Sequence, residues 1–347
     1  MSITQAVKNE SRRLGFTLAG VTTPELPPHV PAYENWLKLE RHGSMNYLAG
    51  ERARLCRRDP RLLLPECRSI LMLAVRYPDP KTTGQDEEDG LSGRVAAYAW
   101  GRDYHLVLPE RLEALSTFIE QLVGSPVPQR WYTDTGPIME RDLAQRAGLG
   151  WIGKNTCLIN PKSGSYFLLA EILLGFVLEP DLPFTADRCG TCTRCIEACP
   201  TGCILPNRTL DARRCIAYLT IENKGEIPLD LRPQIGNRVF GCDVCQMVCP
   251  WNRFAEKKYD QSLAPYLGLT KPDLCADLML RPHGFNQRFK DSPVLRARRR
   301  GYLRNVAVAL GNSKNPAGIP ALEGALQDDE PLVRSHADWA LKQIRKS

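Results

Sequence analysis

The stretch that decides how the centre of this chain folds is Cys189-Gly-Thr-Cys192-Thr-Arg-Cys195-Ile-Glu-Ala-Cys199-Pro200. Its spacing, C-x2-C-x2-C-x3-C-P, is that of ferredoxin loops. Three cysteines at this spacing wrap a tight loop around one iron–sulfur cluster, and the fourth, turned away at the proline, ligates another cluster. The stretch therefore predicts a fold built around more than one iron–sulfur cluster.

An imperfect second copy of the motif follows at Cys242-x2-Cys245-x3-Cys249-Pro250, with Val239 where its first cysteine would stand. Cys215 is the obvious substitute, and Cys203 is left over. The crossed pattern then predicts two [4Fe–4S] clusters, one held by Cys189, Cys192, Cys195 and Cys249 and the other by Cys199, Cys215, Cys242 and Cys245. A pair of structural zinc sites is the alternative, because zinc also binds four thiolates. The spacing favours iron–sulfur clusters.

The composition is that of a globular protein: 347 residues, of which 43% are hydrophobic and 24% charged. This length predicts two or three packed units. Residues 1–16 show no apolar signal region and begin instead with a helix capping box, and no apolar stretch reaches the ~20 residues of a membrane-spanning helix. Thirteen cysteines without an export signal are expected to stay reduced, which favours metal ligands over disulfides. Four of them, Cys56, Cys67, Cys157 and Cys275, stand alone in the sequence and are expected to be small buried hydrophobic residues. We therefore expect a soluble, cytoplasmic protein that does not enter a membrane.

Residues 1–185 mix helical and strand-like patterns and predict an α/β or α+β unit with its own core. The predicted elements are a buried strand over 69–77, helices over 106–123 and 138–147, a strand or buried helix over 166–178, and an acidic surface loop over 81–93. This unit is large enough to be more than an accessory to the cysteine motifs.

Three regions follow this first unit. Residues 186–255 hold the cysteine motifs, and residues 256–302 are irregular and increasingly basic. Residues 303–347 form short amphipathic helices that resemble one or two HEAT-type repeats. Because one such unit cannot bury its own apolar face, we expect it to dock against the rest of the chain.

The positive charge is concentrated in one segment. Of the net charge of +7, residues 1–280 contribute none, because 33 Lys and Arg balance 33 Asp and Glu, and residues 305–347 also balance. Residues 281–304 carry eight basic residues against Asp291 alone, which accounts for the whole excess. Such a run is either a solvated face or a surface for the phosphate backbone of a nucleic acid.

Two motifs in the first unit have more than one interpretation. Residues 148–155 contain the G-x-G-x-x-G pattern and nearly match a phosphate-binding loop, but both motifs need a preceding strand. Here a predicted helix precedes, so Gly148 is better explained as the end of that helix.

Asp134 lies between a strand-like stretch and a Gly-Pro turn, where catalytic groups often lie. Spacing alone favours a cap for the helix that begins near Ile138.

Four features, taken in order, resemble the epoxyqueuosine reductase family. They are Gly101-Arg-Asp-Tyr-His105 followed by Tyr132-Thr-Asp134-Thr-Gly-Pro137, then Arg146-Ala-Gly-Leu-Gly-Trp-Ile-Gly-Lys-Asn155-Thr-Cys-Leu-Ile-Asn160, the double cysteine motif, and Pro331-Leu-Val-Arg334-Ser-His-Ala-Asp-Trp-Ala-Leu341. The resemblance covers nearly the whole chain and keeps the order of all four features.

The resemblance implies an α+β protein of four regions. They are an α/β cobalamin-binding catalytic domain over 1–185, similar in fold to reductive dehalogenases, a ferredoxin-like double [4Fe–4S] domain over 186–255, a basic connecting segment over 256–302, and a HEAT-like helical repeat over 303–347. It also implies cobalamin as a second cofactor. The implied substrate is epoxyqueuosine at the wobble position of a tRNA anticodon stem-loop, which is reduced to queuosine. We expect a monomer that takes its electrons from an external donor.

The resemblance also implies roles for single residues. Asp134 looks like the proton donor to the epoxide oxygen, which outweighs its interpretation as a cap. The residues expected around cobalamin are Arg57, Tyr98, Asp134, Lys154, Asn155, Thr156, Cys157 and Ser165. Tyr104 and Arg141 are expected to hold the modified base, and the residues expected to meet the anticodon-stem phosphates are Arg296, Arg298, Arg299, Arg300 and Arg304.

Two other functions remain open at this point. A ferredoxin-type electron-transfer protein would explain the cysteines, but it needs no unit as large as residues 1–185. A cobalamin-dependent reductive dehalogenase acts on a small molecule, is commonly exported behind a twin-arginine signal, and has no need of the basic segment or the terminal helices. The tRNA-modifying reductase is the hypothesis that uses every region of the chain.

Overall fold

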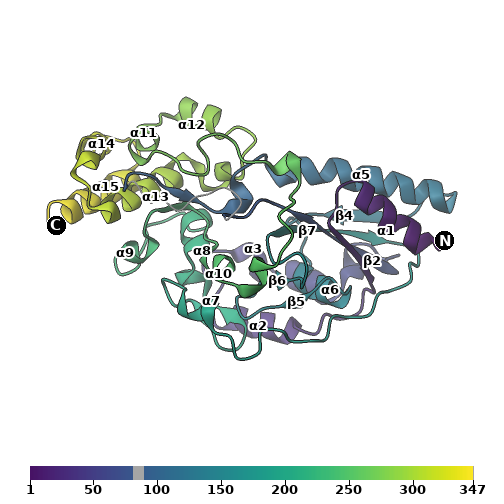
Figure 1. The fold of residues 1–347 in the computed structure, drawn as a ribbon. Helices are drawn as coiled ribbons and strands as arrows, with labels where there is room; N and C mark the ends of the chain where they lie inside the picture. The colour runs from purple at the N-terminus through teal and green to yellow at the C-terminus, as the bar shows by residue number, and fades with distance from the viewer. Residues whose placement is uncertain (81–89, 347) are drawn as a thin grey trace.

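A computed structural model describes residues 1–80 and 90–346 of the chain, and the two termini lie at opposite ends of the molecule (Figure 1). Residues 81–89 of the predicted acidic loop therefore lie outside the described residues. No helix in the described ranges is both long and apolar enough to cross a membrane.

A four-stranded sheet organises the N-terminal unit. Its strands lie in the order β1 (Leu18–Thr22), β2 (Ser69–Arg76), β7 (Phe167–Leu174) and β4 (Gln129–Tyr132), and every neighbouring pair is antiparallel. The apolar sequence of β2 is buried along its whole length, as predicted. A doubly wound α/β domain requires parallel strands joined by helical crossovers. The sheet is therefore of the α+β type, and the α/β expectation for this unit is wrong.

Helices cover both faces of the sheet. On one face α5 (Tyr104–Val123) packs against α1 (Ile3–Arg13) and β7, and on the other α6 (Glu140–Arg146) packs against β1, β2 and β7. Side chains that alternate along β7 therefore enter two different apolar cores. The predicted helices over 106–123 and 138–147 are confirmed, and Gly148 ends the second one at a φ of 77°.

The region of the cysteine motifs consists of short elements held together by loops. These are α7 (Arg194–Glu197), β8 (Ile204–Leu205), β9 (Thr209–Leu210), α8 (Ile216–Ile221), α9 (Arg232–Ile235), β10 (Arg238–Phe240) and α10 (Val244–Met247). Strand β10 pairs with β3 (Arg94–Val95), which belongs to the N-terminal unit. This pairing fixes the cysteine region against the first unit.

Five α-helices follow in the described residues towards the C-terminus: α11 (Leu274–Leu278), α12 (Pro282–Arg288), α13 (Arg298–Ser313), α14 (Ile319–Ala325) and α15 (Pro331–Ile344). Helix α13 is buried from Gly301 to Gly311 and packs on α15, α11 and β10. The terminal helices therefore dock against the rest of the chain, as expected. Two details of the prediction are wrong, because α11 and α12 lie within the segment predicted to be irregular and α13 begins before residue 303.

The N-terminal unit also contains three shorter helices and two short strands. They are α2 (Val30–Lys38), α3 (Asn46–Ala49), α4 (Glu51–Arg58), β5 (Trp151–Ile152) and β6 (Leu158–Ile159). Strands β5 and β6 form a small hairpin that begins just after Gly148. These elements form part of the walls of the cavities described below.

Candidate active site and metal centres

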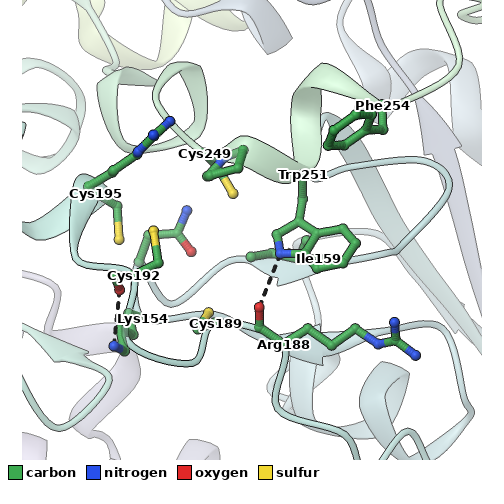
Figure 2. Close-up of a pocket in the computed structure, with 12 residues that line it drawn as sticks. Lys154, Ile159, Arg188, Cys189, Cys192, Cys195, Cys249, Trp251 and Phe254 are labelled. Atoms are coloured by element: carbon green, nitrogen blue, oxygen red, sulfur yellow. Dashed lines mark hydrogen bonds between the residues drawn. The ribbon is translucent and has the colours of Figure 1, made fainter.

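One cysteine cavity lies at the outer side of the cysteine region. It has a volume of about 250 Å³, and the sulfur atoms of Cys189, Cys192, Cys195 and Cys249 face it (Figure 2). Lys154 fastens the loop between two of these cysteines, because its Nζ donates hydrogen bonds to the carbonyl oxygens of Gly190, at 2.7 Å, and Cys192, at 3.0 Å. The structure thus brings together the four cysteines of the first predicted cluster, although the last lies 54 residues or more beyond the other three.

The other four predicted ligands come together deeper in the protein. Cys242 and Cys245 both interact electrostatically with Cys215. Cys203 hydrogen-bonds to Cys215 and lies with its Sγ 3.5 Å from the Sγ of Cys199. The unassigned ninth thiol is therefore buried beside two members of the second set.

The arrangement of these thiols suits clusters better than single ions. In residues 1–80 and 90–346, no three His, Cys, Asp or Glu side chains come close enough together to hold one metal ion. Four thiols instead surround a common cavity in the outer set, as a larger inorganic cluster requires. A cavity of about 250 Å³ among four cysteines suits a cluster better than one zinc ion, which four thiolates contact at about 2.3 Å.

A cleft lies between the sheet and the cysteine region and has two compartments. The first, about 700 Å³, is lined by Asp134, Tyr104, Tyr98 and Cys215, and the second, about 680 Å³, by Arg141 and other residues. Both compartments share three wall residues, Met45, Leu210 and Ala212. The two compartments are therefore adjacent, and one predicted cluster ligand, Cys215, lines the same compartment as the predicted proton donor.

Asp134 is held on an exposed turn directly after β4. Its φ is 56°, and its backbone N–H donates to Oε1 of Glu140 at 2.9 Å. Its carboxylate Oδ2 accepts a hydrogen bond of 2.7 Å from the hydroxyl of Tyr104. The residue at the N-cap of α6 is Met139. The cap interpretation of Asp134 is therefore wrong, and its carboxylate faces the cleft instead.

Two further acids lie behind Asp134, and the sequence analysis did not identify them. Partial burial and the charge of Asp134 raise the pKa of Glu140 to about 7. Glu171 is fully buried, and burial together with the charges of Glu140 and Asp134 raises its pKa well above the ordinary value. For Glu171 the sequence offers one signal of a special role. It is a single acid in the middle of the apolar stretch 166–178, which is unusual for a buried strand.

The residues expected around cobalamin do not all reach the cleft. Arg57, Tyr98 and Asp134 line the first compartment and Thr156 the second. Lys154 and Asn155 line the outer cysteine cavity instead. The thiol of Cys157 is hydrogen-bonded to that of Cys245, and Ser165 is buried in a hydrogen-bond network with Asn252 and Gln246. The cleft therefore brings together about half of the predicted set.

The residues expected to contact tRNA also divide into two groups. Tyr104 and Arg296 line the first compartment, Arg141 lines the second, and Arg298 lies exposed at the start of α13. Arg299 and Arg300 are partly buried, and Arg299 forms an ion pair with Asp328.

The prediction that Arg304 contacts the anticodon-stem phosphates is wrong. It is fully buried, and its guanidinium donates hydrogen bonds to the carbonyl oxygens of Leu219, Asn223 and Gly225. A buried side chain bound in this way stabilises the fold and cannot reach a phosphate group.

Comparisons with known proteins agree with this geometry. Residues 188–252 match a family model described as a 4Fe-4S double cluster binding domain, and residues 57–135 match one described as epoxyqueuosine reductase QueG, DUF1730. The chain therefore has a double-cluster region where the cysteine spacing predicts one.

Relatives match over almost the whole chain. An epoxyqueuosine reductase from Pseudomonas aeruginosa is 41% identical over 98% of this chain and 94% of its own length, and one from Escherichia coli is 37% identical over 98% and 89%. Among solved structures, an epoxyqueuosine reductase with an epoxyqueuosine-modified tRNA-Tyr stem loop matches with a TM-score of 0.89 and 31% identity, covering 99% of this chain and 91% of that one. Another epoxyqueuosine reductase structure, from Bacillus subtilis, was solved with its catalytic aspartate loop swung out of the active site. It matches with a TM-score of 0.87 and 32% identity, covering 99% of this chain and 91% of that one.

Proposed function

The chain belongs to the epoxyqueuosine reductase family, and on that premise we propose that it reduces epoxyqueuosine to queuosine at the wobble position of tRNA anticodons. The observation that carries this proposal is that Asp134 and Cys215 line one compartment. A source of protons and a route for electrons thus meet in the same cleft. Neither a free electron carrier nor a small-molecule dehalogenase accounts for the full-length match to tRNA-modifying relatives.

The cysteines supply the ligands for the iron–sulfur centres in this proposal. Cys189, Cys192, Cys195 and Cys249 hold the outer [4Fe–4S] cluster, and Cys199, Cys215, Cys242 and Cys245 hold the inner one. The cleft suits cobalamin because its two adjacent compartments are large and are lined by aromatic, basic and hydroxyl side chains, with Tyr98, Arg57 and Thr156 among them. When bound, the clusters pass single electrons and cobalamin provides a strongly reducing cobalt centre.

Asp134 acts as the proton donor. Removal of the epoxide oxygen as water consumes two electrons and two protons, and the oxygen leaves far more easily once it is protonated. Tyr104 orients the Asp134 carboxyl through Oδ2, and Glu140 holds the turn through the Asp134 backbone N–H. These two contacts keep the acid directed into the compartment where the modified base would lie.

The tRNA stem would contact the surface beside this compartment. Arg296 lines the compartment, and Arg298 is exposed two residues further along the chain. We propose that these two and Arg300 meet anticodon-stem phosphates, while Arg141 and Tyr104 hold the base. The proposal also takes the enzyme to be a cytoplasmic monomer with a dehalogenase-like N-terminal unit and HEAT-like terminal helices.

The test is turnover by Asp134→Asn. We expect this variant to lose at least about a hundredfold in rate, the usual contribution of a general acid. The measurement is the conversion of epoxyqueuosine-modified tRNA to queuosine tRNA, followed by nucleoside mass spectrometry, with iron and cobalt content unchanged. The control Asp338→Asn removes a carboxylate from an exposed ion pair on α15 and should retain full turnover. Full turnover by Asp134→Asn would refute its role as proton donor.

A further inference from the structure

The outer cysteine cavity and the cleft are lined by different residues. None of the twelve residues that line the outer cavity lines either compartment of the cleft. The inner set of cysteines reaches the cleft wall through Cys215, whereas the outer set does not. An electron that enters at the outer centre would therefore reach the first compartment through the inner one, whose ligand Cys215 lines that compartment.

The rim of the outer cavity carries positive charges that the protein does not neutralise. Arg188 and Arg194 are exposed, and within the described residues neither guanidinium has an ion pair or hydrogen bond. The neighbouring acids are engaged elsewhere, because Asp187 pairs with Arg208 and Glu197 binds Thr193. The cavity lining, as the structure describes it, contains no acidic residue.

The same rim presents an aromatic surface. Phe254 is 77% exposed, and Trp251 lies between it and the cysteines (Figure 2). The Trp251 indole N–H donates to the carbonyl oxygen of Arg188 at 3.2 Å, which fixes the aromatic ring to the basic side of the rim. A small exposed apolar patch bordered by polar groups is typical of a surface that binds another protein.

We propose that this donor rim, formed by Arg188, Arg194, Trp251 and Phe254, is the docking surface for a small acidic protein that carries one electron at a time. The proposal rests on the proposed function, which consumes two electrons per epoxide. Each encounter oxidises the carrier by one electron and reduces the outer cluster by one, so two encounters supply one turnover. The unpaired arginines attract an acidic partner, and a small contact area lets it leave after each transfer.

The experiment measures electron entry alone. Protein loaded with iron–sulfur clusters but free of cobalamin and tRNA is mixed with photoreduced flavodoxin, an acidic carrier, and bleaching of the cluster absorbance gives the second-order rate. We expect Arg188→Glu with Arg194→Glu to lower this rate at least about tenfold at low salt and to flatten its salt dependence. Reduction by the small methyl viologen radical cation should not be slowed.

Two further variants keep the test specific. Arg12→Glu with Lys342→Glu makes the same change in net charge at exposed positions of α1 and α15, and its rate should stay near that of the unaltered protein. Phe254→Ser should slow the flavodoxin reaction without changing its salt slope, because it removes apolar contact and no charge. Iron content confirms in each case that the clusters are intact.

Three results would overturn the proposal. An unchanged flavodoxin rate in the rim variant would show that the carrier docks elsewhere, and an equal loss in both double variants would show only a long-range effect of net charge. A loss of affinity for the tRNA stem-loop with normal electron entry would make the rim a nucleic-acid surface. Because the assay contains neither tRNA nor cobalamin, it can succeed even where epoxyqueuosine reduction fails.

Discussion

Glu171 lies in an apolar core, and within the described residues neither of its carboxyl oxygens has a hydrogen-bond partner. It stands opposite Met72 on β2 and Tyr132 on β4, with α6 packed over the same sheet. An ionised carboxylate in such surroundings is strongly unfavourable, so the group is held in its protonated form. Asp134 thus has a neutral buried acid and the partly buried Glu140 behind it, and both carboxyls can retain protons near neutral pH.

This arrangement predicts how stability changes with pH. The folded state raises the pKa of Glu171 above the ordinary 4.5, so it binds a proton that the unfolded chain releases. The free energy of unfolding should therefore fall as the pH rises above about 4.5, through the pKa of the folded state. Glu140 adds a similar fall that ends near its pKa of about 7.

Glu171→Gln removes the titrating group while keeping its shape. We expect a smaller decline of the unfolding free energy between about pH 5 and about pH 8, measured by urea denaturation at several pH values. Glu323→Gln, at an exposed position on α14, should leave the decline unchanged. An unaltered decline in Glu171→Gln would mean that the buried carboxyl is ionised or absent from the pH response.

At the scale of elements, the interface between α13 and α15 depends on a close approach of the two helices. A Cβ atom added at Gly311 would lie 2.8 Å from the Cα of Ala340 and 2.8 Å from the Trp339 ring. A Cβ atom added at Gly301, near the start of the same helix α13, would have only the Cβ of Ala297 within 4 Å, at 3.9 Å. The same substitution should therefore have opposite effects at the two positions.

Gly311→Ala should lower the free energy of unfolding by about 1–3 kcal/mol, the usual cost of overpacking. Gly301→Ala should raise it by up to about 1 kcal/mol, because alanine favours the helix and no contact is violated. Thermal and urea unfolding of the two variants side by side measures this difference. Equal stabilisation in both would show that the helices can separate without cost.

Local elements could be predicted from the sequence where local rules decide them. The ends of α1 and α6 follow from a capping serine and a glycine with positive φ, and the apolar run of β2 predicts its burial. Strand direction depends on pairing between β2, β7 and β4, which lie far apart in the chain, and no local pattern encodes it. The sequence pattern does not predict the start of α13, because its first turn, Arg298 to Arg300, is basic and resembles a surface segment.

The same distinction applies to the site. Motif spacing alone groups the cysteines correctly around the outer cavity, since the ligand set of a cluster is recorded in the spacing. Glu140 and Glu171 come close to Asp134 only in the folded chain, where β4, β7 and α6 pack together, so no local pattern identifies them. The charge of Arg304 predicts a surface position, but its hydrogen bonds to three carbonyl oxygens place it inside the protein.

At the scale of the whole molecule, one apolar core runs from Val7 in α1 to Ile344 in α15. The terminal helices therefore share their core with the N-terminal unit. Of the basic segment, Arg299 and Arg304 are bound internally, whereas Arg298 is exposed. Fewer side chains of this segment are therefore free to attract a nucleic acid than the sequence suggests.

Arg298→Gln with Arg300→Gln should weaken binding of the anticodon stem-loop. The slope of log affinity against log salt concentration should become shallower by about one to two, about one for each phosphate contact that is lost. Fluorescence anisotropy over a series of salt concentrations measures both quantities. Arg12→Gln with Lys342→Gln removes the same charge elsewhere and should change neither. If the salt slope of the first variant is unchanged, these arginines form a solvated face and tRNA binds at another surface.

The measurement that tests the central claim most directly is nucleoside analysis of epoxyqueuosine-modified tRNA after incubation with the protein and reduced methyl viologen. The protein should carry about eight iron atoms and one cobalt atom per chain, as eight cysteine ligands and one cobalamin require. The account predicts that epoxyqueuosine is then converted to queuosine with the loss of one oxygen atom. Epoxyqueuosine that stays unchanged in the presence of fully loaded, reduced protein would contradict it.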